Sequence, residues 1–154
     1  MVTRTSEHAI RALLFLARHS GGECVPAERI ARALGAPANY LSKTLNALAR
    51  QGIVSSTRGP AGGFRLRRHP ARVTLAEVVA TFDDARPRAV CLLGDRPCDG
   101  LHPCRAHAAW SRVCAEMRAP LGATTLAGLL EPSEIEEISA AGTSGRDDRV
   151  AIAA

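Results

Sequence analysis

Apolar side chains recur every three or four residues over two stretches near the start of the chain, residues 6–19 and 27–34. This spacing gathers them on one side and is typical of amphipathic helices. The Ser-Gly-Gly run at 20–22 ends the first helix, and Gly35 ends the second and begins a tight turn. A third helix opens with a proline and covers about residues 37–51. The pattern therefore predicts three helices, with a short turn between the second and the third.

The third predicted helix has an apolar inner face and a polar outer face. Its polar residues recur at helical spacing, so they form one exposed stripe of Asn39, Ser42, Lys43, Asn46 and Arg50. Two short helices joined by a glycine-containing turn, with such a stripe on the second, are typical of a helix-turn-helix that reads DNA. An ordinary amphipathic surface helix also has a polar face, so the stripe alone leaves that alternative open.

The next segment predicts a β-hairpin. Residues 53–57 and 64–67 predict two strands, and a glycine-rich turn joins them. Arg58 lies at the tip of this turn, where flexible residues let the backbone approach a phosphate and an arginine suits a narrow minor groove. The same glycines also suit a tight hairpin that needs positive φ angles, and the two interpretations are compatible. We expect this hairpin to be the wing of a winged helix-turn-helix.

Two further helices and a tail complete the expected organisation. Residues 73–82 predict one helix, and residues 103–119 predict a longer one. The longer helix carries an apolar stripe that can pack against a partner helix in a dimer or against its own core: Ala106, Trp110, Val113 and Met117. We expect a mainly α fold with a small β-hairpin wing, divided into a winged helix-turn-helix domain (1–84), a cysteine loop with a dimerisation helix (85–131) and a disordered tail (132–154).

Charge is divided unevenly along the chain. Residues 1–72 contain twelve Lys and Arg against three Asp and Glu, a net charge of +9, whereas residues 73–154 have a net charge of −4. A basic half joined to a mildly acidic half suggests a module that binds a polyanion, followed by a second functional part. The alternative is a solvated, arginine-rich surface that reflects coding bias, because arginine outnumbers lysine nineteen to one.

The sequence also bears on the compartment of the protein and on whether it is an enzyme. No stretch approaches the roughly 18 apolar residues of a membrane span, and the N-terminus predicts a mature helix rather than a signal peptide. We therefore expect a cytoplasmic protein, in which clustered cysteines indicate metal or redox chemistry more often than disulfides. No substrate pocket or acid/base pair stands out, so we do not expect an enzyme.

Three of the five cysteines lie in one proline- and glycine-rich segment. Six residues separate Cys91 from Cys98, five separate Cys98 from Cys104, and His107 follows three residues later. The composition predicts a loop that can turn its thiolates toward one centre. Three thiolates favour an iron–sulfur cluster, which usually takes four ligands. Zinc sites usually show ligand pairs two to four residues apart, so zinc is a weaker alternative, beside a clusterless thiol switch.

The run NYLSKTLNALARQGIVSSTRGPAGGFRL, followed by VTLAEVV and the three-cysteine loop, resembles the IscR/NsrR-type (Rrf2) family of winged-helix transcription regulators. The resemblance covers nearly all of residues 1–131. It implies a homodimer whose recognition helices and wings grip two half-sites of a palindromic operator. A subset of members carries an iron–sulfur cluster, and its loss or change alters their affinity for DNA. The resemblance therefore also implies such a cluster here.

The resemblance also implies roles for individual residues. Cys91, Cys98 and Cys104 match the cluster-binding cysteines, for a 4Fe–4S or a 2Fe–2S centre. By the same likeness Asn39, Ser42 and Lys43 face the bases, and Arg58 enters the minor groove. The whole expected DNA-binding set is Asn39, Tyr40, Ser42, Lys43, Asn46, Arg58, Gly59, Gly62 and Gly63.

The fourth cluster ligand stays open. His107 follows the third loop cysteine by one helical turn and lies on the same face. Some family members use a histidine at this spacing, and others use an acidic residue of the partner subunit near the start of the first helix, which here is Glu7. We favour Glu7 for a 4Fe–4S centre and His107 for a 2Fe–2S centre, with His102 as a weaker third candidate. Cys114 is ~15 Å along the helix from the loop, and Cys24 precedes the helix-turn-helix. We therefore expect neither cysteine to be a ligand of the cluster.

The combined interpretation is a homodimeric DNA-binding repressor in the cytoplasm. Its operator affinity is expected to depend on a cluster that senses nitric oxide, redox stress or iron and cluster status. A regulator of the same fold with zinc or a thiol switch is one alternative. An iron–sulfur electron-transfer protein or redox enzyme is another, but it leaves the polar stripe and the basic half unexplained.

Overall fold

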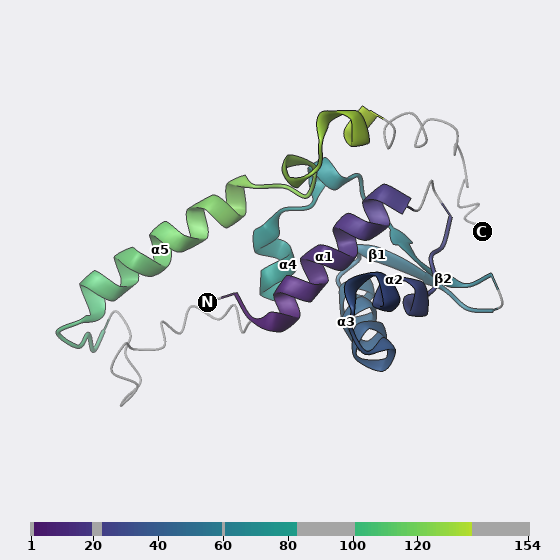
Figure 1. Ribbon diagram of the computed structural model, residues 1–154. Helices are drawn as coiled ribbons and strands as arrows, with labels where there is room; N and C mark the ends of the chain where they lie inside the picture. The colour runs from purple at the N-terminus through teal and green to yellow at the C-terminus, as the bar shows by residue number, and fades with distance from the viewer. Residues whose placement is uncertain (1, 20–22, 60, 83–100, 137–154) are drawn as a thin grey trace, which may run out of the picture.

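The computed structural model describes residues 2–19, 23–59, 61–82 and 101–136. The elements within these ranges are α1 (Arg4–His19), α2 (Ala27–Leu34), α3 (Ala38–Arg50), β1 (Val54–Thr57), β2 (Gly63–Leu66), the 3-10 turn η1 (Pro70–Arg72), α4 (Leu75–Phe82), α5 (His107–Ala123) and the 3-10 turn η2 (Ala127–Leu129). The fold is mainly helical with a two-stranded antiparallel hairpin, as the sequence predicts. In Figure 1 the first four helices and the hairpin gather in one body, from which α5 projects.

The body is held together by aliphatic side chains from α1, α2 and α3. The largest of these are fully buried: Leu13, Leu16, Ile30, Leu41, Leu45 and Leu48. α1 begins two residues earlier than its apolar pattern predicts. Thr3 explains this start, because its Oγ1 accepts the backbone N–H of Ser6 at 3.3 Å and so satisfies a free amide of the first turn.

The hairpin pairs Val54 with Leu66 and Thr57 with Gly63 in a regular antiparallel register. It is also attached to the helix pair, because Val25 and Phe64 exchange both backbone hydrogen bonds at 2.9 Å. Val25 lies two residues before α2, so this isolated bridge extends the hairpin toward the start of the helix-turn-helix. The wing is therefore part of the body rather than a free hairpin.

α4 is capped by a reciprocal pair of hydrogen bonds. The backbone N–H of Thr74 donates to Glu77 Oε2 at 3.0 Å, and the backbone N–H of Glu77 donates to Thr74 Oγ1 at 3.3 Å. This arrangement is a capping box. Arg68, which follows β2, donates from Nη1 to Glu77 Oε1 at 3.1 Å. The segment leaving the wing is thus connected to the first turn of α4.

α5 differs from its prediction at both ends. It begins at His107 rather than at Pro103, because residues before it form a turn in which His107 N donates to Cys104 O at 3.0 Å. It continues past Pro120 to Ala123, where the sequence predicts an end near Ala119. None of its residues is buried. No helix within the described ranges is long and apolar enough to cross a membrane.

The Glu77 carboxylate, which caps α4, is expected to make the stability of the fold depend on pH. The backbone N–H of Thr74, followed by the Arg68 guanidinium, lowers the pKa of Glu77 below its ordinary value of 4.5. A lowered pKa in the folded state stabilises the fold above pH 4.5, and this contribution is lost as pH falls through the lowered value. Glu77→Gln is expected to reduce the free energy of unfolding by about 0.5–1 kcal/mol at neutral pH and to remove part of the acid dependence.

Urea unfolding from neutral pH to about pH 3 measures both effects. Glu116→Gln, at an exposed position of α5, is the control and should stay within about 0.5 kcal/mol of the unmodified protein. A Glu77→Gln profile that falls with pH as steeply as that of the unmodified protein would exclude this carboxylate as a source of the acid sensitivity.

Candidate DNA-binding surface and cysteine site

The polar stripe of α3 lies on the protein surface. Asn39, Lys43, Asn46 and Arg50 are exposed, and Ser42 is half-buried. The opposite face of the helix is buried through Leu41, Leu45 and Leu48. An apolar face that packs into the body fixes the helix, and it leaves the donors of the stripe pointing outward. This is the arrangement that a recognition helix requires.

Tyr40 connects the start of α3 to the start of α1. Its ring contacts the His8 ring edge-on, with 5.6 Å between centroids. His8 is itself held to α1 by a 2.8 Å hydrogen bond between Nδ1 and the carbonyl oxygen of Arg4, and Thr44 Oγ1 donates to Tyr40 O at 3.0 Å. Tyr40 is half-buried. The sequence indicated Tyr40 only as a DNA-binding residue, but in the structure it also makes a contact between two helices.

The glycines of the wing turn have different surroundings. Gly59 has a φ of +109° and open space around it. At Gly62 and Gly63 an added Cβ would overlap with backbone atoms, of Thr57 in one case and of Val25 in the other. Close approach within the protein therefore accounts for both residues. Arg58 follows β1 directly and is exposed, as expected for a side chain at the wing.

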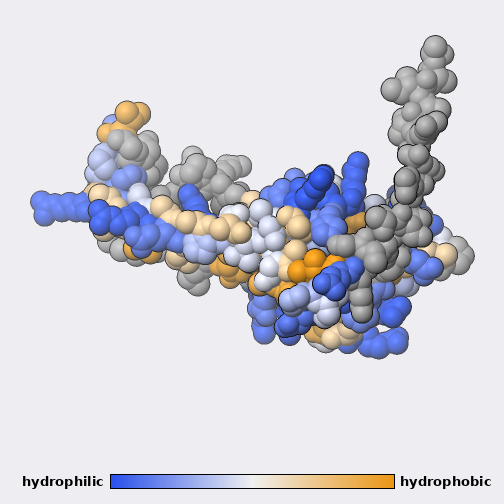
Figure 2. All heavy atoms as spheres, turned by 90° about the horizontal axis from the view of Figure 1, so that it is seen from above, coloured by the Kyte–Doolittle hydropathy of each residue, from blue (hydrophilic) through white to orange (hydrophobic). Residues whose placement is uncertain are grey.

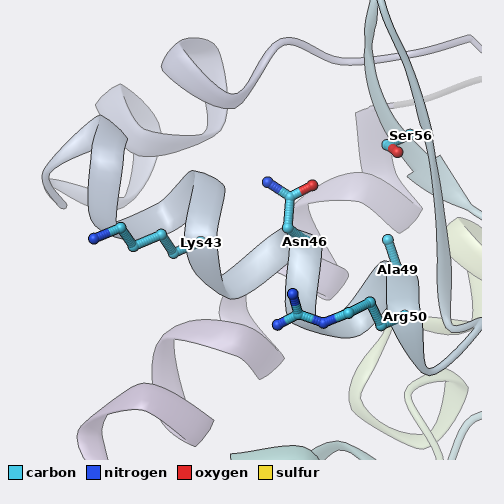
Figure 3. Close-up of a pocket in the computed structure, with 5 residues that line it drawn as sticks. All are labelled: Lys43, Asn46, Ala49, Arg50 and Ser56. Carbon is cyan, nitrogen blue, oxygen red and sulfur yellow. The ribbon is translucent and has the colours of Figure 1, made fainter.

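A groove lies between α3 and β1, and its full set of lining residues could not be read from the sequence. It has a volume of about 680 Å³ and is lined by Lys43, Asn46, Ala49, Arg50 and Ser56. Figure 3 shows the side chains of the helix on one side and Ser56 on the other. Ser56 and Ala49 are the members that sequence reasoning missed, because neither carries a charge or belongs to the polar stripe.

The cysteine site is only partly within the described residues. Cys91 and Cys98 lie outside them. Cys104 is half-buried, and His107 begins α5 three residues later, also half-buried. Among the described residues, no group of three or more His, Cys, Asp or Glu side chains gathers as a metal site.

The other residues that were weighed as cluster ligands are Cys24, Cys114 and Glu7. Cys24 is half-buried, and its thiol donates to Thr57 Oγ1 at 3.4 Å, beside the wing. Cys114 is half-buried on α5. The Glu7 side chain is 57% exposed and lies 3.6 Å from Arg11. The first turn of α1, which holds Glu7, is separate from the first turn of α5 in Figure 1.

The fold and the exposed recognition stripe define a winged helix-turn-helix DNA-binding protein. The chain belongs to the Rrf2 family, whose model is described as an iron-dependent transcriptional regulator and matches residues 2–132. It is similar to the HTH-type transcriptional regulator IscR of Xenorhabdus nematophila, with 31% identity over 90% of this chain and 84% of that protein. IscR of Vibrio atlanticus is 30% identical over 90% of this chain and 79% of its own length.

Solved structures support the same fold. IscR of T. potens has a TM-score of 0.67 and 24% identity, covering 86% of this chain and 88% of that one. CymR, the global cysteine regulator of B. subtilis, also has a TM-score of 0.67, with 21% identity, 84% of this chain and 95% of that one. The expected resemblance and fold class are confirmed, and the chain is an IscR-like transcriptional regulator of the Rrf2 family.

Proposed function

We propose that the protein is a homodimeric repressor whose affinity for a palindromic operator is set by an iron–sulfur cluster. The observation that carries the proposal is the Rrf2 match, which runs through all three loop cysteines. The signal is nitric oxide, redox stress or iron and cluster status. In this proposal the exposed stripe of α3 enters the major groove, Arg58 enters the minor groove, and the protein acts on DNA in the cytoplasm.

The donors that the structure describes fit a cluster. Thiolates suit iron–sulfur centres, and Cys104 offers a half-buried thiol with His107 three residues later. Cys91, Cys98 and Cys104 would hold the cluster, which supplies a centre that small oxidants and nitric oxide modify. The first turns of α1 and α5 are apart within one chain, which favours Glu7 of the partner subunit over Glu7 of the same chain as a ligand. Ligation by His107 needs no partner subunit.

Anaerobic purification tests the cluster, with a visible spectrum and counts of iron and sulfide. Cys104→Ala is expected to lose iron and visible absorbance. Arg58→Ala should keep the absorbance and weaken operator binding about tenfold or more. Glu7→Ala and His107→Ala, in the same assay, identify the fourth ligand. If holo and cluster-free protein bind the operator equally, the sensing proposal fails.

A clusterless regulator with a thiol switch or a zinc ion is the second candidate. Three half-buried cysteines within the described residues, Cys24, Cys104 and Cys114, supply thiols for such a switch. It predicts a colourless anaerobic preparation without sulfide, in which zinc counts or thiol oxidation follow the change in operator affinity. An electron-transfer role predicts a coloured protein that binds no duplex.

A further inference from the structure

A small cavity lies where the end of α3, the segment after β2 and one face of α4 meet. We call it the Arg68 cavity. Its volume is about 230 Å³, and its lining residues are Gln51, Ile53, Arg68, Glu77, Ala80 and Thr81. It shares no lining residue with the groove between α3 and β1. At about 30 Å³ for each water displaced, the cavity suits a ligand of roughly eight non-hydrogen atoms.

Arg68 supplies the positive charge of the cavity, and one edge of its guanidinium is unused. Its hydrogen bonds within the described residues both come from Nη1, which donates to Glu77 Oε1 at 3.1 Å and to Arg72 O at 3.3 Å. Nε is buried and has no hydrogen-bond partner among the described residues. A buried donor without an acceptor destabilises the folded state. A ligand oxygen that reaches Nε would remove this cost.

The unused edge has the geometry of a carboxylate site. Nε–H and one N–H of Nη2 are parallel and lie on the edge of the planar guanidinium that does not include Nη1. Two parallel donors of this kind match the two oxygens of a carboxylate. Because Nε is shielded, a small rotation of the guanidinium toward the cavity is needed to present both donors. The Arg68 side chain is 34% exposed, which leaves room for that rotation.

The charges beside this edge favour a ligand with a single negative charge. Glu77 pairs with Nη1 of Arg68, and its other oxygen accepts the backbone N–H of Thr74 at 3.0 Å. Arg68 is the only lysine or arginine among the described residues that line the cavity. A second negative charge on the ligand would therefore be repelled by Glu77 without a further cation to offset it. A monocarboxylate meets this condition better than a phosphate does.

The walls of the cavity restrict the rest of the ligand. Ile53 is buried and Ala80 presents a methyl group, so one side is apolar. Gln51 follows the last turn of α3 and carries an amide that can donate or accept. Thr81 Oγ1 donates to Glu77 O at 3.0 Å, which leaves its hydroxyl as an acceptor. This lining fits a short carboxylate with a small apolar group, with or without a hydroxyl or keto oxygen.

We propose that the Arg68 cavity is a binding site for a small monocarboxylate, held by the Nε and Nη2 edge of Arg68. Arg68 follows the wing, Gln51 ends α3, and α4 packs against α1 and α5. A bound carboxylate would therefore connect the end of the recognition helix and the exit of the wing to the helix that packs against α5. The site takes a ligand other than DNA or a cluster, and its test needs neither.

Titration of the whole chain with acetate, lactate and pyruvate tests the site, followed by NMR of the arginine side chains. The Nε–H signal of Arg68 is expected to shift in a saturable manner with at least one of the three. The Nε–H signal of Arg72, which is exposed in η1, should not follow the same curve. Pyruvamide replaces the carboxylate with a neutral amide, and it should cause no saturable shift. Chloride at equal ionic strength is the second control.

Two variants separate ligand binding from a structural role of Arg68, with affinity measured by calorimetry. Arg68→Lys keeps a positive charge beside Glu77 but lacks the planar pair of donors, so it should weaken carboxylate binding about tenfold or more. Ala80→Leu fills the cavity from an exposed position of α4 and leaves the guanidinium in place, so it should abolish binding. Ala115→Leu, at an exposed position of α5, is the matched control and should bind normally. Thermal unfolding without ligand establishes that each variant is folded.

The outcomes separate the site from unspecific binding of anions. Saturable binding that Arg68→Lys and Ala80→Leu both weaken supports the proposal. No saturable shift of the Arg68 signal with any of the three acids would overturn it, as would binding that Ala80→Leu leaves unchanged. Tighter binding of inorganic phosphate than of every carboxylate would overturn the ligand class. These results are independent of whether the protein binds an operator.

Discussion

Gly63→Ala is expected to lower the free energy of unfolding by about 3 kcal/mol, through backbone strain and overlap together. Gly63 has a φ of +152°, and an added Cβ would overlap with the carbonyl oxygen of Val25 and lie 2.5 Å from its carbonyl carbon. Both neighbours are backbone atoms, so no side chain can rotate away. Relief requires Val25 and Phe64 to separate, with loss of the two hydrogen bonds that attach the wing to the body.

Thermal and urea unfolding measure this effect, and a decrease in the melting temperature of roughly 10 °C is expected. Gly59→Ala is the matched control in the same turn. Its φ is also positive, but nothing lies within 4 Å of an added Cβ, so its cost should be about 1–2 kcal/mol. Equal losses at the two positions would show that backbone conformation alone matters and that the contact with Val25 does not.

Val113→Glu combined with Met117→Glu is expected to make the protein monomeric and to weaken operator binding by about 10²–10⁴-fold. The two side chains are 43% and 48% exposed, on a helix that projects from the body and buries none of its residues. Figure 2 shows apolar surface along this projecting arm. In the proposed dimer the stripe packs against the partner, where two carboxylates would lose their hydration without gaining hydrogen bonds.

Sedimentation measures the oligomeric state, and binding to an operator selected from a random duplex library measures the affinity. Ala115→Glu combined with Ala119→Glu adds the same charges at the same spacing on the opposite face of α5, where both positions are exposed. This control should remain dimeric. A dimer that survives the Val113 and Met117 changes but not the control would place the contact on the other side of α5.

The helix-turn-helix could be predicted closely from the sequence because local signals define it. Apolar spacing and the residues that end helices place α2 at its predicted bounds and α3 within one residue of them at each end. The ends of α5 could not be predicted in the same way. Pro103 resembles a first-turn residue, but a separate turn closes at His107, and Pro120 is tolerated inside the last turns although prolines usually end helices.

The part of the candidate DNA-binding surface that lies on a single helix could be predicted from the sequence. The stripe of α3 is periodic, so its exposure follows from its sequence. The groove is not periodic, because Ser56 reaches α3 only through the orientation of the hairpin. That orientation depends on the bridge between Val25 and Phe64, which are far apart in the chain and carry no sequence signal for pairing. Cys91, Cys98 and residues 137–154 of the expected disordered tail lie outside the described residues, so those expectations remain predictions. Residues 132–136 were also expected to be disordered, but they are helical, and Glu134 forms an ion pair with Arg18 of α1 at 2.8 Å.

The bridge between Val25 and Phe64 also affects what kind of operator the protein can accept. It joins the wing to Val25, two residues before α2, and so ties the wing to the helix-turn-helix within one chain. In the proposed dimer, each half-site would then be contacted by the helix and wing of a single chain. The distance between the two half-sites would depend on how the two proposed subunits are arranged. That arrangement would select operators by the number of base pairs in their central spacer.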